Sequence, residues 1–212
     1  QIMKSNIKSS QIKKIFITHM HGDHIYGLPG LLATLGLSGN SKGIEIYGPS
    51  ELRGFINSAL RSSFCKLSFP LHFVEVENCA SKNKILFENN SIKVNCARLK
   101  HKIPAYGYRV SEKDKPGLFD IKKAQYMNIK PGPIYSELQQ GKKVILADGR
   151  SFNGKDFCGP PRKGESFVYC TDTVFSESAV LLSKNADLLV HESTFSEEDE
   201  SMAYEKLHST TI

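Results

Sequence analysis

The segment from His19 to His24, His-Met-His-Gly-Asp-His, places three imidazoles and one carboxylate on a short stretch of chain. Imidazole nitrogens and carboxylate oxygens are ligands that zinc and similar transition metals take in proteins. His19 and His21 can converge on one ion, and Asp23 and His24 can turn toward a second ion beside it. Two adjacent metal ions suit hydrolysis, because they lower the pKa of water and stabilise charge on the attacking and leaving oxygens. The segment therefore predicts a hydrolytic metal site.

Three apolar segments of strand type end at ionisable side chains. Residues 14–18 precede His19, residues 166–171 precede Asp172, and residues 187–190, which we expect to be buried, precede His191. Ionisable side chains at strand ends are typical of active sites in α/β proteins. By itself, Asp172 also fits a helix cap, and His191 fits a structural histidine.

The pattern of apolar residues predicts strands that alternate with helices near both ends of the chain, which favours a layered α/β fold. We expect strands near residues 14–18, 43–47, 71–76, 84–87, 91–99, 106–110, 143–146, 166–171 and 187–190. We expect a buried helix or turn over residues 27–37, and helices near residues 50–62, from about residue 176, and over about 196–207.

The charge of the chain is unevenly distributed. Residues 98–130 carry nine Lys and Arg against three acids, whereas residues 166–212 carry two against nine. A basic block favours a polyanionic partner, although a solvated lysine-rich surface has the same composition. Residues 112–142 mix Lys, Gly and Pro, which predicts an inserted arm rather than core.

The chain lacks the features of a membrane-spanning or secreted protein. Its 212 residues contain no apolar run of the ~20 residues that cross a bilayer. The first residues carry no apolar core of a signal peptide. The five cysteines are odd in number and include no CxxC pair, so a reducing compartment fits best. We expect an intracellular protein that binds no membrane, with cytoplasm or nucleus favoured and an organelle left open, because any targeting signal would lie upstream.

Separated motifs resemble the ribonuclease Z family, the tRNA 3′-processing endonucleases of the metallo-β-lactamase superfamily. They lie at residues 16–32, 100–109, 131–133, 159–164, 169–173, 191–195 and 208–211. The resemblance implies a four-layer αβ/βα sandwich as a single domain over residues 1–212. It also implies truncation at both termini and a basic arm inserted near residues 112–142. The arm lies between His101 and Asp172, a position that resembles the short form of the family. The resemblance to the short form implies a homodimer.

The resemblance also implies a ligand set for two Zn²⁺ ions, and Mn²⁺ suits the same ligands. One ion would be held by His19, His21 and His101, the other by Asp23 and His24, with Asp172 bridging both. The family has a further histidine ligand in a C-terminal segment, and no such segment precedes Ile212. We therefore expect weaker binding at the second site, and low or absent activity for this stretch of chain alone.

The implied reaction is hydrolysis of precursor tRNA after the discriminator base, which removes the 3′ trailer and leaves a 3′-hydroxyl. Asp23 would orient the attacking hydroxide and act as general base, and Glu192 with His208 would donate the proton to the leaving oxygen. Residues expected to contact the substrate are Pro131, Gly132 and Pro133 in the arm, Arg162 and Lys163 in a following loop, and Ser209 and Thr210 near the end.

Two other functions remain open at this point. The first is a hydrolase of the same superfamily that cleaves a small phosphodiester or ester, against which the basic arm and the His-Ser-Thr motif argue. The second is an inactive RNA-binding relative. Taken singly, His101 also fits a surface residue, Glu192 a structural carboxylate, and His208 a helix end.

Overall fold

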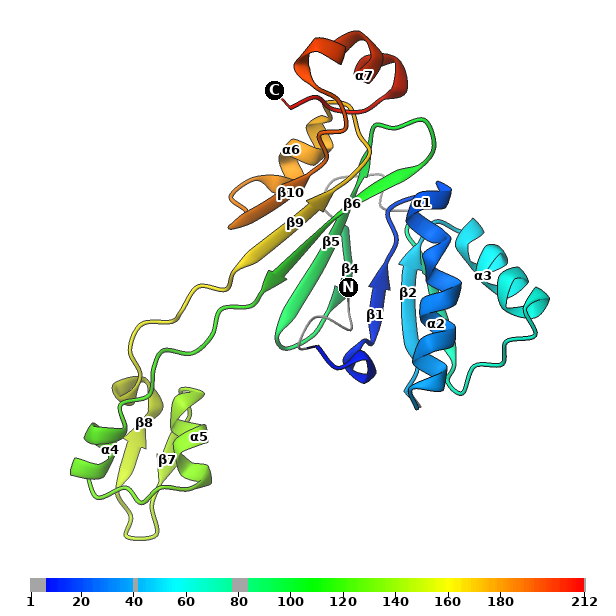
Figure 1. Cartoon of the computed structure of the whole chain (residues 1–212). Coiled ribbons are helices and arrows are strands. Elements are labelled where there is room, and N and C mark those ends of the chain that lie inside the picture. Colours follow the sequence, from blue (N-terminus) through cyan, green and yellow to red (C-terminus); the bar gives the residue numbers. More distant parts are fainter. Residues whose placement is uncertain (1–6, 40–41, 78–83, 212) are drawn as a thin grey trace. The chain divides into compact units, whose positions relative to one another are not determined.

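A computed structural model describes residues 7–39, 42–77 and 84–211, and the chain divides into two compact units (Figure 1). Unit 1 comprises residues 1–89, 93–110 and 166–212, and unit 2 comprises residues 90–92 and 111–165. The histidine-rich segment belongs to unit 1.

The first half of unit 1 is built around a small parallel sheet. Its strands are β1 (Lys14–Phe16), β2 (Ile44–Gly48) and β3 (Leu71–Glu75), in the order β1-β2-β3, and its helices are α1 (Gly22–Ile25), α2 (Gly27–Leu37) and α3 (Glu51–Ser62), after a short 3₁₀ turn, η2 (Ser9–Gln11). Ile44 and Ile46 alternate along β2, so both side chains lie on one face. Leucines of α2 and α3, among them Leu32 and Leu52, are buried in the same cluster. The helices therefore cover this face of the sheet.

The second half of unit 1 is a five-stranded sheet in the order β10-β9-β6-β5-β4. Its strands are β4 (Lys84–Glu88), β5 (Ile92–Leu99), β6 (Ala105–Glu112), β9 (Ser166–Cys170) and β10 (Leu188–His191), followed by the 3₁₀ turn η5 (Glu197–Asp199) and the helix α7 (Glu200–Lys206). Helix α6 (Glu177–Ser183) packs Ala179 and Leu182 against Val168 and Cys170 of β9.

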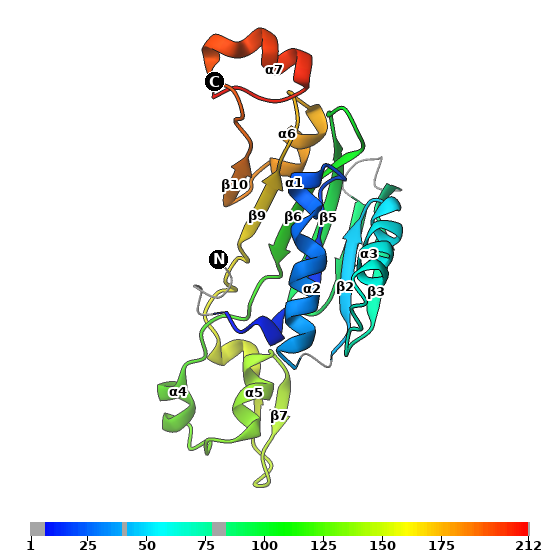
Figure 2. The same ribbon diagram turned by 45° about the vertical axis from the view of Figure 1, so that its right-hand side comes forward.

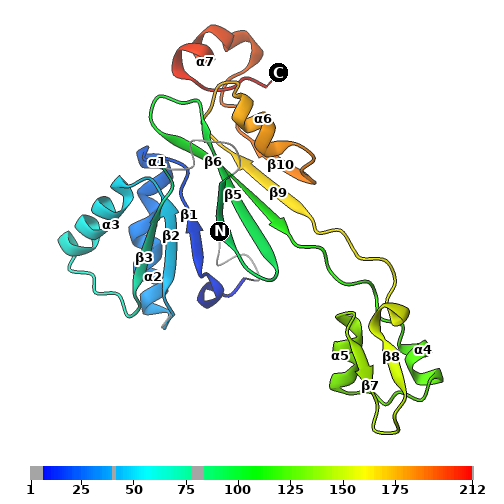
Figure 3. The ribbon, with the colours of Figure 1, turned by 180° about the vertical axis from the view of Figure 1, so that it is seen from behind.

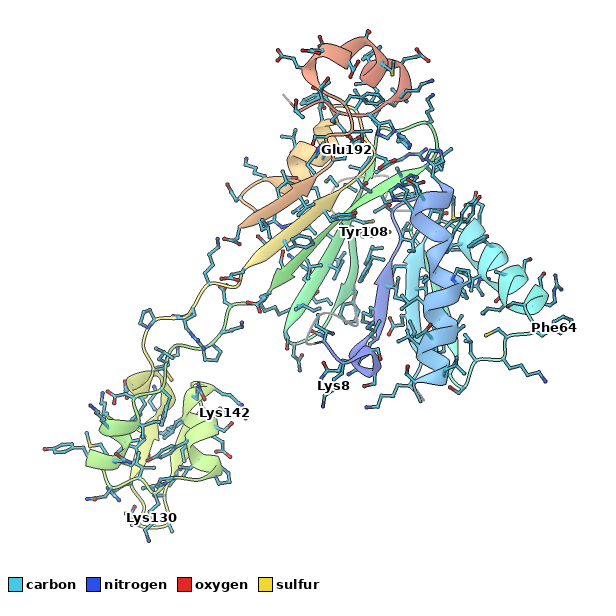
Figure 4. The ribbon with its side chains drawn as sticks, viewed as in Figure 1. Lys8, Phe64, Tyr108, Lys130, Lys142 and Glu192 are labelled. Atoms are coloured by element: carbon cyan, nitrogen blue, oxygen red, sulfur yellow. The ribbon has the colours of Figure 1, made fainter. Side chains whose placement is uncertain are left out.

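Aromatic side chains fill the space between the two sheets. Tyr47 of β2 is buried with Tyr106 and Tyr108 of β6, and the ring of Phe16 stacks on Tyr47 at 4.6 Å. The Tyr108 hydroxyl, labelled in Figure 4, donates to the carbonyl of Ile17 at 2.7 Å. Unit 1 thus has the order helices, sheet, sheet, helix, which Figures 2 and 3 show from two further sides. This order confirms the predicted four-layer sandwich.

Unit 2 has a small core of its own. Its elements are α4 (Ile121–Tyr126), α5 (Pro133–Gln139), β7 (Lys143–Ile145), β8 (Ser151–Asn153) and a 3₁₀ turn, η4 (Gly154–Phe157). Ala124 and Leu138 are buried with Val144 and Phe157. The arm expected at residues 112–142 is therefore the first part of a unit that closes its core with residues further along the chain. That the chain is one domain with an inserted arm stays a proposal.

Strand β10 differs from the expectation of a buried segment. Leu188, Leu189 and Val190 are 57%, 46% and 41% exposed, because β10 is an edge strand that pairs only with β9 among the described residues. The run of apolar residues fits a strand, but the sequence does not show whether a second strand pairs with its other edge. No helix in the described ranges is long and apolar enough to span a membrane.

Candidate metal centre

The histidine-rich segment lies where β1 and β9 end and where β6 begins. His19 and His21 lie in the loop between β1 and α1, His101 lies in the turn between β5 and β6, and Asp172 follows β9 directly. His208 follows α7 at the same end of the unit (Figure 1). Segments far apart in sequence are thereby brought together.

Four side chains form a compact group of candidate ligands. The facing atoms of His19, His21, His101 and Asp172 all lie within 4.8 Å of one another. The Nδ1 atom of His21 is 3.1 Å from Nε2 of His19 and 3.2 Å from Nε2 of His101. The Oδ2 atom of Asp172 is 3.5 Å from Nε2 of His19 and 3.8 Å from Nε2 of His101. Ligand atoms at the corners of a tetrahedral zinc site are about 3.3 Å apart, given bonds of about 2.0–2.1 Å. The donor set therefore fits one zinc-sized ion.

Hydrogen bonds outside this group fix which atom each ligand turns inward. The Nδ1 atom of His101 donates to the carbonyl of Leu207 at 3.0 Å, which leaves Nε2 facing the group. The Thr171 hydroxyl donates to Oδ1 of Asp172 at 2.7 Å, which leaves Oδ2 facing it. Such outer partners orient metal ligands and raise their basicity.

The protonation states suit metal binding. Burial and the neighbouring His24 lower the pKa of His19 to about 4, although the charge of Asp172 opposes this. Burial and His101 likewise lower the pKa of His21. The pKa of Asp172 is also lowered, since the hydrogen bond from Thr171 and the nearby histidines outweigh the opposing effect of burial. At neutral pH the two imidazoles keep their lone pairs and the carboxylate keeps its charge.

Asp23 and His24 lie beside the group but outside it. The Nε2 atom of His24 is 3.1 Å from Oδ2 of Asp23 and 3.5 Å from Oδ2 of Asp172. The Asp23 side chain is 78% exposed. Oδ2 of Asp172 thus lies near both sets of candidate ligands, and the ring of His24 packs on that of His19 at 4.1 Å.

Glu192 and His208 form a hydrogen-bonded pair at the edge of the group. The Nδ1 atom of His208 is 2.9 Å from Oε1 of Glu192, and its Nε2 is 4.0 Å from Oδ2 of Asp172. Figure 4 labels Glu192 near α7. Burial raises the pKa of Glu192, but hydrogen bonds from the Thr194 hydroxyl and from backbone N–H groups, including that of Thr173, outweigh it and lower the pKa. Glu192 is thus an ionised acceptor that orients the His208 ring.

The remaining predicted contact residues are divided between the two units. The Ser209 hydroxyl donates to the Thr173 carbonyl at 2.6 Å, and Thr210 forms a bridge with Phe195. Residues 131–133 are exposed where α5 begins, and Nε of Arg162 donates to the Pro116 carbonyl at 3.3 Å. Residues 131–133, Arg162 and Lys163 all belong to unit 2.

Several residues that support the site were not predicted, among them Thr171, whose hydroxyl donates to Asp172. Thr173 and Thr194 hydrogen-bond Glu192, and Leu207 receives the hydrogen bond of His101. The threonines flank predicted residues within the quoted motifs, which is a local signal. The role of the Leu207 carbonyl cannot be predicted from the sequence, because every residue type has a backbone carbonyl.

Comparison with known proteins gives consistent relatives over the whole chain. Ribonuclease Z of Prochlorococcus marinus strain MIT 9215 is 90% identical over 212 residues, which are 100% of this chain and 68% of that protein. Ribonuclease Z of strain NATL1A is 59% identical over 210 residues, which are 99% of this chain and 67% of that protein. The model of a family described as Anti-Pycsar protein Apyc1 matches residues 1–115.

Solved structures of similar fold agree with these relatives. The short form of human tRNase Z has a TM-score of 0.65 and 28% identity, over 99% of this chain and 69% of that one. The metallo-β-lactamase fold protein YhfI of Bacillus subtilis has a TM-score of 0.54 and 15% identity, over 97% of this chain and 58% of that one, and shows the fold alone. Because the relatives from Prochlorococcus are bacterial, the expectation of a nuclear or organellar compartment is not supported.

Proposed function

The chain belongs to the ribonuclease Z family, and from this premise we propose that it removes the 3′ trailer of precursor tRNA by hydrolysis after the discriminator base. The observation that carries the proposal is the group of three histidines and Asp172, held by three segments of unit 1 that are distant in sequence. The product is a tRNA with a 3′-hydroxyl and a trailer with a 5′-phosphate. We place the reaction in the cytoplasm.

The residues present fit two Zn²⁺ ions, and Mn²⁺ suits the same donors. His19, His21 and His101 would hold one ion, Asp23 and His24 the other, and Asp172 both. The distances of 3.1 Å and 3.5 Å around His24 support the second site, since they lie close to the spacing of zinc ligands. When bound, the two ions stabilise negative charge on the attacking and leaving oxygens of the phosphate.

The chain's own groups would move the protons. Water attacks phosphorus and the bond from phosphorus to the tRNA 3′-oxygen breaks. The exposed Asp23 carboxylate orients the water and accepts its proton. His208, held through Nδ1 by Glu192, donates a proton from Nε2 to the leaving 3′-oxygen. Ser209 and Thr210 would lie beside the phosphate, and a hydrogen bond from the Ser209 hydroxyl to it would replace the one this hydroxyl donates to the Thr173 carbonyl.

We assign the grip on the tRNA body to unit 2. Residues 111–165 carry eleven Lys and Arg against seven acids, and Lys130 is among those that are exposed. Phosphate contacts from such side chains position an RNA without reading its sequence. Pro131, Gly132 and Pro133 would line the grip, and Arg162 and Lys163 would contact the 3′ end. The working form would be a homodimer, in which the arm of one subunit serves the site of the other.

Cleavage of a labelled precursor tRNA by the complete gene product tests the proposal. We expect one cut after the discriminator base, a 3′-hydroxyl on the tRNA, loss of activity with a chelator, and loss in His21→Ala. His72→Ala is the matched control, because His72 is exposed on β3 away from the ligands. Hydrolysis of a small phosphodiester without any cut in precursor tRNA would refute the proposal in favour of a small-molecule hydrolase.

A further inference from the structure

Thr173 is fully buried, and the structure gives each of its polar backbone and side-chain atoms a hydrogen-bond partner. Its N–H donates to Oε1 of Glu192 at 2.9 Å, and its carbonyl accepts from the Ser209 hydroxyl at 2.6 Å. Its hydroxyl accepts from the N–H of Lys100 at 3.1 Å and donates to the carbonyl of Val174 at 2.7 Å. None of these bonds reaches a candidate metal ligand directly.

The partners of Thr173 are neighbours of the residues assigned to the reaction. Lys100 precedes the ligand His101, and Ser209 follows the proton donor His208. Lys100 and Val174 also form an antiparallel bridge, in which the Val174 N–H donates to the Lys100 carbonyl at 3.0 Å. One buried residue therefore joins three segments that are distant in sequence.

The residue before Thr173 needs such support. Asp172 has a φ of +40°, in the left-handed region that residues with a side chain rarely adopt. A backbone held in that region persists only where the surroundings determine it. The bonds of Thr173 begin at the peptide that leaves Asp172, so they restrain this conformation from one side.

We propose that Thr173 is a positioning residue, which sets Oδ2 of Asp172 relative to His101 and His208 and touches neither metal nor substrate. This inference rests on the proposed function, because it takes Asp172 as the shared ligand and His208 as the donor. The Thr173 hydroxyl is the group on which this positioning depends, because it accepts the hydrogen bond from the N–H of Lys100, the residue before His101.

Two substitutions separate the hydroxyl from the shape of the side chain. Thr173→Val keeps the shape and removes the hydroxyl, whereas Thr173→Ser keeps the hydroxyl. Val168→Ala is the stability control. Val168 is buried in β9, and the core cluster to which it belongs contains none of the site residues. The measurements are Zn²⁺ affinity by calorimetric titration, kcat and KM on precursor tRNA, and crystal structures of the metal-free variants.

We expect Thr173→Val to weaken Zn²⁺ binding by about 10-fold, the lower end of the loss that follows removal of a direct partner of a metal ligand, because Thr173 acts on Asp172 only through the backbone. Its kcat should fall while KM stays unchanged, and Thr173→Ser should restore both affinity and kcat. The crystal structure of Thr173→Val should show Asp172 out of its left-handed conformation. Val168→Ala should leave Zn²⁺ affinity unchanged.

Equal Zn²⁺ affinity in Thr173→Val and Val168→Ala, or equal loss in the Val and Ser variants, would overturn the inference. Unchanged Asp172 geometry in the Thr173→Val crystal would overturn it as well, whatever the enzyme cleaves. Failure of the unsubstituted protein to cut precursor tRNA would instead refute the proposed function, and the crystal comparison would still decide the position of Asp172.

Discussion

At the scale of single residues, the centre depends on which atom each side chain leaves unbonded. His101 uses Nδ1 for the Leu207 carbonyl, and His208 uses Nδ1 for Glu192, so both rings turn Nε2 inward. A ring with the opposite orientation would present its nitrogen to the protein instead. The outer hydrogen bonds thus decide whether a histidine can serve as ligand or as proton donor.

The Glu192–His208 pair gives a prediction at this scale. His208→Asn should lower the single-turnover cleavage rate by about 10²–10⁴-fold, the contribution typical of a general acid. Binding of precursor tRNA, measured by filter retention, should change little. A leaving group of low pKa, such as a nitrophenolate, needs no proton and should be released by the variant at nearly the normal rate.

Glu192→Gln should act in the same direction as His208→Asn but more weakly, because the amide can still accept a hydrogen bond without carrying the charge. The exposed His72→Ala variant serves as control. An unchanged rate in His208→Asn with precursor tRNA would remove His208 from the mechanism.

The sequence predicted most of the candidate ligands because local motifs carry them. His19, His21 and His24 share one short segment, and the motif around Asp172 has a distinctive order. The structure then brings His101 and Asp172 to the same group. The roles of Leu207 and Thr173 depend on the tertiary fold, which no local pattern reports.

At the scale of elements, strands and longer helices agree with their hydrophobic patterns. The buried helix or turn expected over residues 27–37 is the helix α2, and the strand expected over 166–171 is β9. The segment expected as one helix over 196–207 is instead the turn η5 followed by α7, which ends at Lys206 and is followed by Leu207 in a left-handed conformation. No sequence pattern predicted this left-handed residue, which directs the Leu207 carbonyl toward His101.

Unit 2 was less predictable because its elements are short. Helices α4 and α5 have 6 and 7 residues, too few for a clear helical period. Its buried apolar residues are also widely spaced among charged ones. The composition therefore indicated an insertion but neither its helices nor its end at residue 165.

Removal of unit 2 gives a prediction at the element scale. The Glu112 N–H donates to the Glu165 carbonyl at 2.8 Å, so residues 113–164 can be replaced by an Asn-Gly turn. We expect this variant to keep Zn²⁺ binding and hydrolysis of a small phosphodiester. Its KM for precursor tRNA should rise by about 10-fold or more, as loss of several phosphate contacts requires. An unchanged KM would exclude unit 2 from tRNA binding.

Single lysines of unit 2 should act through the phosphate backbone. Lys130→Ala should weaken binding of every precursor tRNA alike and reduce the salt dependence of log K by about 1. Filter binding at several salt concentrations measures this slope. Lys66→Ala, which removes an exposed lysine from unit 1, should leave the slope unchanged, and an equal effect would mean that unit 2 is not specifically involved.

At the scale of the whole molecule, helix α2 gives a prediction about assembly. It carries no charged residue, and Leu37 at its end is 91% exposed. Helices without a polar face are typically covered by another surface. If the proposed homodimer uses α2, Leu37→Glu should sediment as a monomer at concentrations where the unsubstituted protein is a dimer.

Phe64→Glu is the matched control for the assembly experiment, because Phe64 is 92% exposed after α3. It should leave the dimer intact. A Leu37→Glu protein that remains dimeric would exclude the end of α2 from the interface.

The central claim is that unit 1 gathers a metal centre around Asp172, and a zinc count tests it most directly. The protein is stripped with a chelator, titrated with Zn²⁺, and assayed by calorimetry and by metal analysis after dialysis. We expect two ions per unsubstituted chain, the second bound more weakly. His24→Ala should retain one ion, and Asp172→Asn should retain neither tightly. A protein that binds no Zn²⁺, or an Asp172→Asn variant that binds as the unsubstituted protein does, would contradict this account.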